Sequence, residues 1–101
     1  MQIVYTGKAK QDLQKIREYY GLRTSVGLKS IVNDIVNVVE DIPNSIYKGR
    51  VTPHPEVWEK ITPKYNYLLP YYIFRGKVYI LRIYNPRRGE LDYKKIVDLQ
   101  E

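Results

Sequence analysis

The spacing of apolar residues changes at Pro43, and this change constrains the fold more than any other feature of the sequence. Before Pro43 the apolar residues recur at intervals of three and four, which is the period of an amphipathic helix. After it, β-branched and aromatic residues gather in short runs, as they do in strands. The sequence therefore predicts an α+β fold in which a two-helix hairpin precedes most of the sheet and packs on one of its faces.

Two helices are predicted before Pro43. The first follows Thr6, whose hydroxyl is suited to capping it, and stops at Gly21. The second is capped by Thr24 or Ser25 and is ended by Pro43. Most of its apolar residues are β-branched, so a strand is the competing prediction. Its polar residues also recur at helical spacing, and its length of about 18 residues exceeds that of an ordinary strand, so we favour the helix.

The strands are predicted at the start of the chain and after Pro43. An N-terminal strand precedes the two-helix hairpin, and a three- or four-stranded antiparallel sheet follows it. Arg75-Gly76 fits the two-residue loop of a β-hairpin. Pro70 interrupts its run, and we expect it at a bulge or on an unpaired side of its strand. The tail, residues 91–101, is predicted as a short helix or strand. The strand candidates are residues 2–6, 46–51, 57–62, 65–74 and 78–84.

The length and composition indicate one compact domain, residues 1–101. No run rich in Pro, Gly or Ser is long enough to be a linker. The chain has no cysteine, which excludes disulfides and thiolate zinc sites. Its first apolar run is too short for a signal peptide or a membrane span, so we expect a cytoplasmic protein without membrane contact.

Positive charge is concentrated in the second half of the chain. There are 17 Lys and Arg residues against 11 Asp and Glu residues, a formal charge of +6. Residues 1–43 hold 6 basic and 5 acidic side chains, whereas residues 44–101 hold 11 basic and 6 acidic ones. We expect the second half to meet a polyanion or an acidic partner. The alternative is that the basic balance only favours solubility.

The order of these elements and several short motifs resemble the RelE/ParE superfamily of toxins over nearly the whole chain. The most specific part is a last strand followed by two arginines and, five residues on, a tyrosine. The motifs are Asp12-Leu13-Gln14-Lys15-Ile16 in the opening helix, Ile42-Pro43 at the end of the second helix, Gly49-Arg50-Val51 before a tyrosine-rich hairpin, the strand 78–84, and Asn85-Pro86-Arg87-Arg88 with Tyr93.

The resemblance implies a toxin of a type II toxin-antitoxin system that a cognate acidic antitoxin holds inactive. Members of the RelE kind inhibit translation by cleaving mRNA in the ribosome without a metal, and members of the ParE kind inhibit DNA gyrase. A third alternative is a non-catalytic member that only binds protein or nucleic acid. RNA cleavage is our first hypothesis, with the ribosome and mRNA as partners and gyrase inhibition as the alternative.

Metal-free RNA cleavage needs a base, cations that stabilise the phosphorane, and an acid for the leaving oxygen. The resemblance assigns phosphate stabilisation to Arg87 and proton transfer or base stacking to Tyr93. It places Lys60 and Lys64 in a basic segment where some members have a lysine base. The competing interpretation is that Arg87 is a solvated charge after a strand and that Tyr93 only packs the tail against the sheet.

The chain departs from the ribonuclease pattern at the start of the third predicted strand. Active ribonucleases of the superfamily tend to have an arginine there, where this chain has Tyr67-Leu68-Leu69. Arg50 or Arg82 can supply the missing cation from neighbouring strands, and Arg88 is a further candidate contact to nucleic acid.

No cofactor or metal is predicted. His54 is the single histidine and has no cysteine to share a metal with it. The six glycines are scattered, so there is no glycine-rich phosphate loop.

Overall fold

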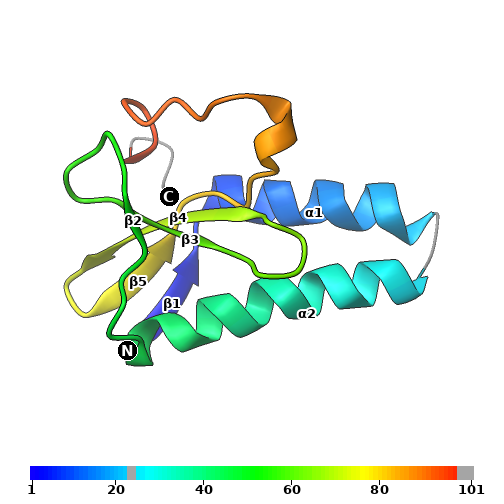
Figure 1. The fold of residues 1–101 in the computed structure, drawn as a ribbon, viewed down its shortest axis with the longest axis horizontal. Helices are drawn as coiled ribbons and strands as arrows, with labels where there is room; N and C mark the ends of the chain where they lie inside the picture. Colours follow the sequence, from blue (N-terminus) through cyan, green and yellow to red (C-terminus); the bar gives the residue numbers. More distant parts are fainter. Residues whose placement is uncertain (23–24, 98–101) are drawn as a thin grey trace.

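The computed structural model describes residues 1–22 and 25–97, and within them a strand and a helical hairpin precede the rest of a sheet (Figure 1). This order confirms the predicted α+β fold. The elements are β1 (Gln2–Tyr5), α1 (Gly7–Gly21), α2 (Ser25–Asp41), the 3-10 helix η1 (Ile42–Asn44), β2 (Arg50–Val51), β3 (Trp58–Ile61), β4 (Leu68–Phe74), β5 (Lys77–Ile80) and the 3-10 helix η2 (Pro86–Arg88).

The sheet has five strands in the order β1-β5-β4-β3-β2. The pairs β2–β3, β3–β4 and β4–β5 are antiparallel, which confirms the predicted antiparallel sheet. Strand β1 pairs in parallel with β5, with Ile3 opposite Val78. The β4–β5 hairpin turns at Arg75 and Gly76, and both have the positive φ, 50° and 76°, that a tight two-residue loop requires.

The helix boundaries follow from their caps. The Thr6 hydroxyl accepts a hydrogen bond from the Ala9 amide at 3.2 Å, as predicted, and donates one to the Leu81 carbonyl at 3.1 Å. The cap of α1 is thereby tied to the end of β5. Ser25 is the first residue of α2, and Thr24, the other cap candidate, lies outside the described residues. Helix α2 ends at Asp41, where Pro43 redirects the chain into η1.

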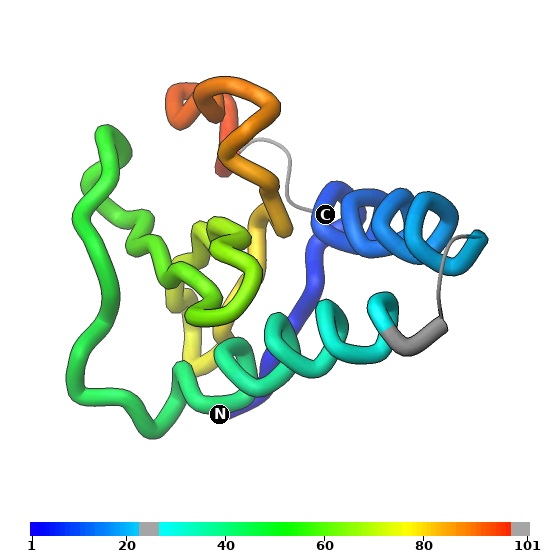
Figure 2. Tube along the Cα trace, turned by 45° about the vertical axis from the view of Figure 1, so that its right-hand side comes forward, coloured from blue at the N-terminus to red at the C-terminus, as the bar shows by residue number. Residues whose placement is uncertain are grey.

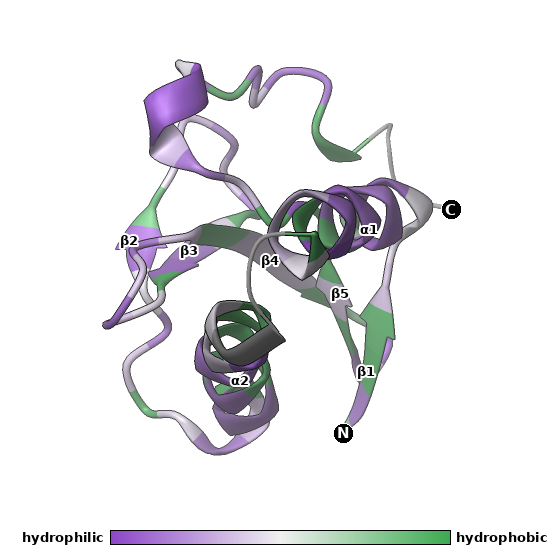
Figure 3. Cartoon of the chain, turned by 90° about the vertical axis from the view of Figure 1, so that its right-hand side faces the viewer, coloured by the Kyte–Doolittle hydropathy of each residue, from purple (hydrophilic) through white to green (hydrophobic). Residues whose placement is uncertain are grey.

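Both helices cover one face of the sheet and form the main core with it. The hydrophilic side of α2 faces outward (Figure 3). Trp58 packs at the edge of this core, as expected for a structural aromatic. The buried residues are Ala9, Ile16, Ile31, Ile35, Val39, Ile42, Tyr67, Leu69, Tyr71, Val78, Ile80 and Ile83.

The opposite face of the sheet is covered by the chain that follows η2. The orange-to-red segment and α2 lie on opposite sides of the molecule (Figure 2). Val57, Tyr72 and Leu81 form a smaller apolar cluster on this face, and Ile96 of the tail packs into it with 1% of its surface exposed. The sheet is thus covered on both faces.

Pro70 lies at a bulge, as predicted. Tyr71 pairs with Ile80, and Leu68 pairs with Tyr84. Between these pairs, two residues of β4 (69–70) lie opposite three residues of the segment after β5 (81–83). The Pro70 carbonyl accepts from the Leu81 amide at 2.9 Å, and the proline itself has no amide to donate.

Three strand predictions were too long, and the tail prediction is wrong for residues 91–96. The predicted strand 65–74 begins only at Leu68, because Tyr65 lies in a turn. Of residues 46–51, only Arg50 and Val51 form a strand, because Gly49 has φ +109° and ends the extended backbone. The last predicted strand, 78–84, is regular only to Ile80, because the bulge opposite Pro70 interrupts it. Residues 91–96 form loop and turns where a helix or strand was predicted, since their backbone hydrogen bonds are local. The end of the predicted segment, 98–101, lies outside the described residues.

Candidate functional site

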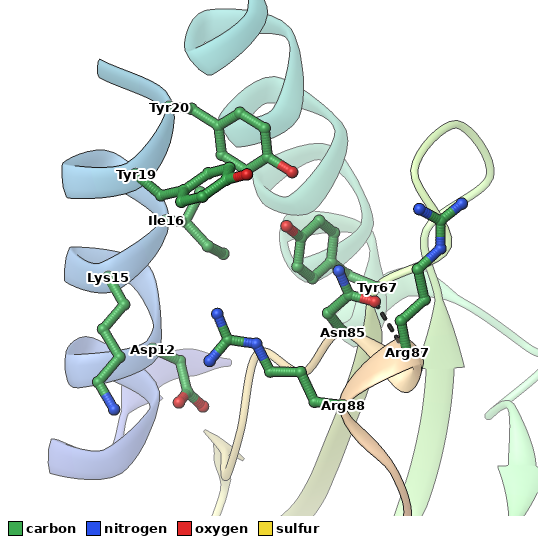
Figure 4. A pocket seen from close by; sticks show the side chains of 9 residues that line it. All are labelled: Asp12, Lys15, Ile16, Tyr19, Tyr20, Tyr67, Asn85, Arg87 and Arg88. Atoms are coloured by element: carbon green, nitrogen blue, oxygen red, sulfur yellow. Dashed lines mark hydrogen bonds between the residues drawn. The ribbon is translucent and has the colours of Figure 1, made fainter. Parts of the chain in front are cut away.

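A basic cleft lies between α1, the start of β4 and η2 (Figure 4). It consists of two adjoining cavities of about 300 and 320 Å³ that share Tyr20, Tyr67, Asn85 and Arg87. The first cavity adds Lys15 and Arg88, and the second adds Lys64. Four cations therefore border the basic cleft: Lys15, Lys64, Arg87 and Arg88.

The two arginines are presented by the short helix η2. Asn85 caps it, its side-chain oxygen accepting from the Arg87 amide at 3.0 Å, and Pro86 fixes its first turn. The Arg88 side chain reaches toward α1, whereas Arg87 points toward the loop before β4 (Figure 4). Both residues are exposed, and neither forms an ion pair within the described part of the chain. Their charge is available to a ligand.

A buried phenol, Tyr67, and a half-buried one, Tyr20, form the wall between the cavities. Tyr67 is 5% exposed, and its hydroxyl faces that of Tyr20 (Figure 4). Burial raises the pKa of Tyr67 to about 12, with smaller contributions from the neighbouring Tyr20 phenol and the hydrogen bond between them. Tyr67 therefore stays neutral at physiological pH and is a fixed hydrogen-bonding wall.

We expect the raised pKa of Tyr67 to make the protein less stable at high pH. In the unfolded chain the phenol ionises near its ordinary value of 10, whereas in the folded chain it stays neutral to about 12. The stabilisation is complete below pH 10 and is lost as the pH rises toward 12. At about pH 11 the free energy of unfolding is expected to be lower by about 1 kcal/mol. Urea unfolding at about pH 9 and about pH 11 measures it. Tyr67→Phe must lose less stability over this interval than the wild type, and an equal loss would contradict the assignment.

Lys64 is held at the cleft by the loop between β3 and β4. The buried carboxylate of Asp34 on α2 accepts from the backbone amides of Lys64 and Tyr65, at 3.2 and 2.8 Å. The Lys64 ammonium then donates to the Ser30 hydroxyl at 2.8 Å and lies 5.5 Å from the centre of the Tyr65 ring. Asp34 thus places both a cation and an aromatic ring at the rim of the basic cleft.

Arg82 is engaged within the protein. Its guanidinium donates to both carboxylate oxygens of Asp12, at 2.6 and 3.0 Å, and is 15% exposed. The Asp12 carboxylate also accepts from the Ile83 amide at 3.0 Å. Asp12 lines the cleft, but its charge is compensated by this pair, so the cations of the cleft stay in excess.

A second site lies on the opposite face of the sheet and centres on Glu59, which the sequence analysis did not select. Glu59 is 5% exposed, and its carboxylate accepts from the Arg50 guanidinium and from the Tyr93 hydroxyl. Burial raises the pKa of Tyr93, and the hydrogen bond and charge of Glu59 raise it further. These three residues line a cavity of about 740 Å³. The sequence signal for this site was an acidic residue, Glu59, in the interior of a predicted strand.

Lys60 lies outside the basic cleft. Its ammonium donates to the Ser45 hydroxyl at 3.0 Å and to the Tyr47 carbonyl at 2.5 Å, and it is 4.9 Å from the centre of the Tyr47 ring. It lines a cavity beside α2 that Arg50 and Glu59 also border. The four residues considered for catalysis are thus distributed: Lys64 and Arg87 share the basic cleft, Tyr93 borders the Glu59 cavity, and Lys60 borders a third cavity.

Neither a metal site nor a membrane-spanning helix is found in residues 1–22 and 25–97. No group of three or more His, Cys, Asp or Glu side chains is close enough there to hold a metal ion. No helix in that part of the chain has the length and apolar character needed to cross a bilayer.

Comparison with known proteins identifies the family. The family model described as the ParE toxin of the type II toxin-antitoxin system parDE matches residues 3–89. A solved structure described as the chromosomal ParDE TA system from P. aeruginosa is similar, with a TM-score of 0.73 and 25% sequence identity. The match covers 84% of this chain and 95% of that chain. Among curated proteins, none matches at a significant level. The chain belongs to the ParE toxin family of type II toxin-antitoxin systems.

Proposed function

We propose that this chain is a toxin that acts by binding DNA gyrase rather than by catalysis. One observation carries the proposal: Arg87 and Arg88 border a cleft of cations and phenols without an ion pair of their own among the described residues. Such a surface suits recognition of an anionic protein or nucleic-acid partner. The family match supports the ParE kind of action, and the position of Lys60 and Tyr93 outside the cleft that holds Lys64 and Arg87 supports binding over chemistry.

The same cleft suits an acidic antitoxin as the inhibitor. A disordered segment that folds on contact can neutralise cations and cover aromatic surface in one step. Tyr19 and Tyr20 provide that surface on α1, and Lys15 and the two arginines of η2 surround it. We propose that the toxin is cytoplasmic and stays inactive while this segment occupies the basic cleft.

A supercoiling assay with purified gyrase tests the proposal. We expect the wild type to inhibit supercoiling and Arg87→Glu with Arg88→Glu to inhibit at least about tenfold less, because like charges then face the anionic partner. Lys77→Glu is the matched control, since it changes the charge of an exposed residue at the far end of β5. Inhibition that is absent in the wild type, or equal in all three proteins, would refute gyrase binding through the cleft.

Metal-independent mRNA cleavage at the ribosome is the second candidate, and the Glu59 site favours it. The Glu59 carboxylate has the chemistry to take the proton from a 2′-hydroxyl, Arg50 to stabilise the phosphorane, and Tyr93 to protonate the leaving oxygen. The same toxin preparation, incubated with ribosome-bound message and a chelator, tests this. If RNA cleavage is the activity, Glu59→Gln and Tyr93→Phe lower the rate by about 100-fold or more. Intact message with the wild type would exclude it.

A further inference from the structure

The chain after η2 returns across the sheet, and its residues 89–96 form neither a helix nor a strand. Residues 89–97, here called the strap, lie over the face opposite the helices (Figure 1). The backbone hydrogen bonds of the strap are local, such as that from the Lys95 amide to the Asp92 carbonyl at 3.3 Å. Its backbone is therefore not part of the ladder that holds the five strands together.

The strap is held by a few apolar side chains. Ile96 is buried in the cluster formed by Val57, Tyr72 and Leu81, while Leu91 and Val97 pack only partly against that cluster. The residues between them, such as Asp92 and Lys94, are exposed. Burial of this small area stabilises the strap far less than the main core stabilises the helices, because the stabilisation scales with apolar area.

One polar contact joins the strap to the sheet within the described residues. The Tyr93 hydroxyl donates to the buried Glu59 carboxylate, which the Arg50 guanidinium approaches from β2. A hydrogen bond to a charged acceptor contributes more than a neutral one. Closing of the strap therefore gives the Glu59 carboxylate a hydrogen-bond donor and also shields this carboxylate from water.

Gly89 lies where the strap leaves η2. Its φ of +99° is a conformation that residues with a Cβ rarely adopt, and nothing lies within 4 Å of the position that a Cβ would occupy. The position combines conformational freedom with open space, as a hinge requires.

We propose that residues 89–97 are a hinged strap that opens and closes over the Glu59–Arg50 pair, with the Tyr93–Glu59 hydrogen bond as its latch and Gly89 as its hinge. Closed, the strap covers the carboxylate and the apolar cluster. Open, it exposes a carboxylate beside a guanidinium above an apolar floor. The strap thus regulates access to this face of the sheet, whatever the cellular target of the toxin.

Hydrogen exchange of the full-length toxin, followed by mass spectrometry, tests the strap. Tyr93→Phe removes only the latch hydroxyl, and we expect amides of residues 90–97 to exchange about tenfold faster while those of α1, α2 and β4 are unchanged. Gly89→Ala keeps the latch but strains the closed backbone, and we expect a similar local increase of about tenfold. Tyr71→Phe is the matched control, because its hydroxyl donates to the Lys48 carbonyl at 2.6 Å, away from the strap.

The outcome for these variants decides the proposal independently of gyrase or RNA. A local increase in the strap with Tyr93→Phe or Gly89→Ala, absent with Tyr71→Phe, supports a hinged strap. If neither variant opens the strap separately from the rest of the chain, residues 89–97 are an integral part of the fold and the proposal is wrong.

Discussion

Asp12→Ala is expected to lower the free energy of unfolding by about 3 to 5 kcal/mol. The Asp12 carboxylate is 8% exposed and accepts two hydrogen bonds from the Arg82 guanidinium and one from the Ile83 amide. Its removal leaves a nearly buried positive charge and a backbone donor without their acceptor. Urea unfolding followed by the fluorescence of Trp58, the single tryptophan, measures the loss.

Two variants show whether the unpaired charge is the cause. Glu18→Ala changes an exposed acid on the same helix and is expected to alter stability by less than about 0.5 kcal/mol. Asp12→Leu with Arg82→Met removes both charges, so most of the loss is expected to be recovered. A single Asp12 variant as stable as Glu18→Ala would show that the pair contributes nothing to the fold.

Gly49→Ala is expected to destabilise the protein by about 3 kcal/mol or more. A Cβ at position 49 would lie 2.3 Å from the Glu59 carbonyl oxygen, which belongs to the backbone of β3 and cannot move aside. The φ of +109° adds strain for any residue with a Cβ. Relief of the clash would push the backbone at position 49 away from β3 and so separate β2 from β3. The urea concentration at the midpoint of unfolding is expected to fall accordingly.

Gly76→Ala separates the clash from the backbone strain. Gly76 also has positive φ, +76°, but nothing lies within 4 Å of the position of its Cβ. Its replacement is expected to cost about 1 kcal/mol, the strain alone. Equal losses for the two alanine variants would mean that the close approach at Gly49 has no energetic weight.

The helices and the hairpin were predictable because their signals are local. Thr6 marks the start of α1 through capping, α1 ends at Gly21 as predicted, and the positive φ at Arg75 and Gly76 follows from the demands of a two-residue turn. The missing amide of Pro70 predicted either a bulge or an unpaired side of its strand, and the structure has the bulge. The parallel pairing of β1 with β5 was not predictable, since nothing in residues 2–6 specifies a partner so distant in the chain.

The candidate site was predictable only in part. Arg87 and Arg88 were expected to be accessible because they follow the last strand, and both are exposed. Lys64 joins Arg87 at one cavity because Asp34 on α2 holds the intervening loop, a contact that spans 30 residues. Arg82 was considered for nucleic-acid contact, but the structure pairs it with Asp12, and no local pattern distinguishes an arginine that is paired from one that is free.

By itself the sequence determined the α+β class, the helix boundaries, the hairpin and the excess of positive charge in the second half. Each of these depends on residues within a few positions of one another, or on composition. Only the tertiary structure decided which charges are free, that Glu59 lies between Arg50 and Tyr93, and that the tail covers the second face of the sheet. Those properties depend on pairs of groups far apart in the chain, whose energies exist only once the core has brought them together.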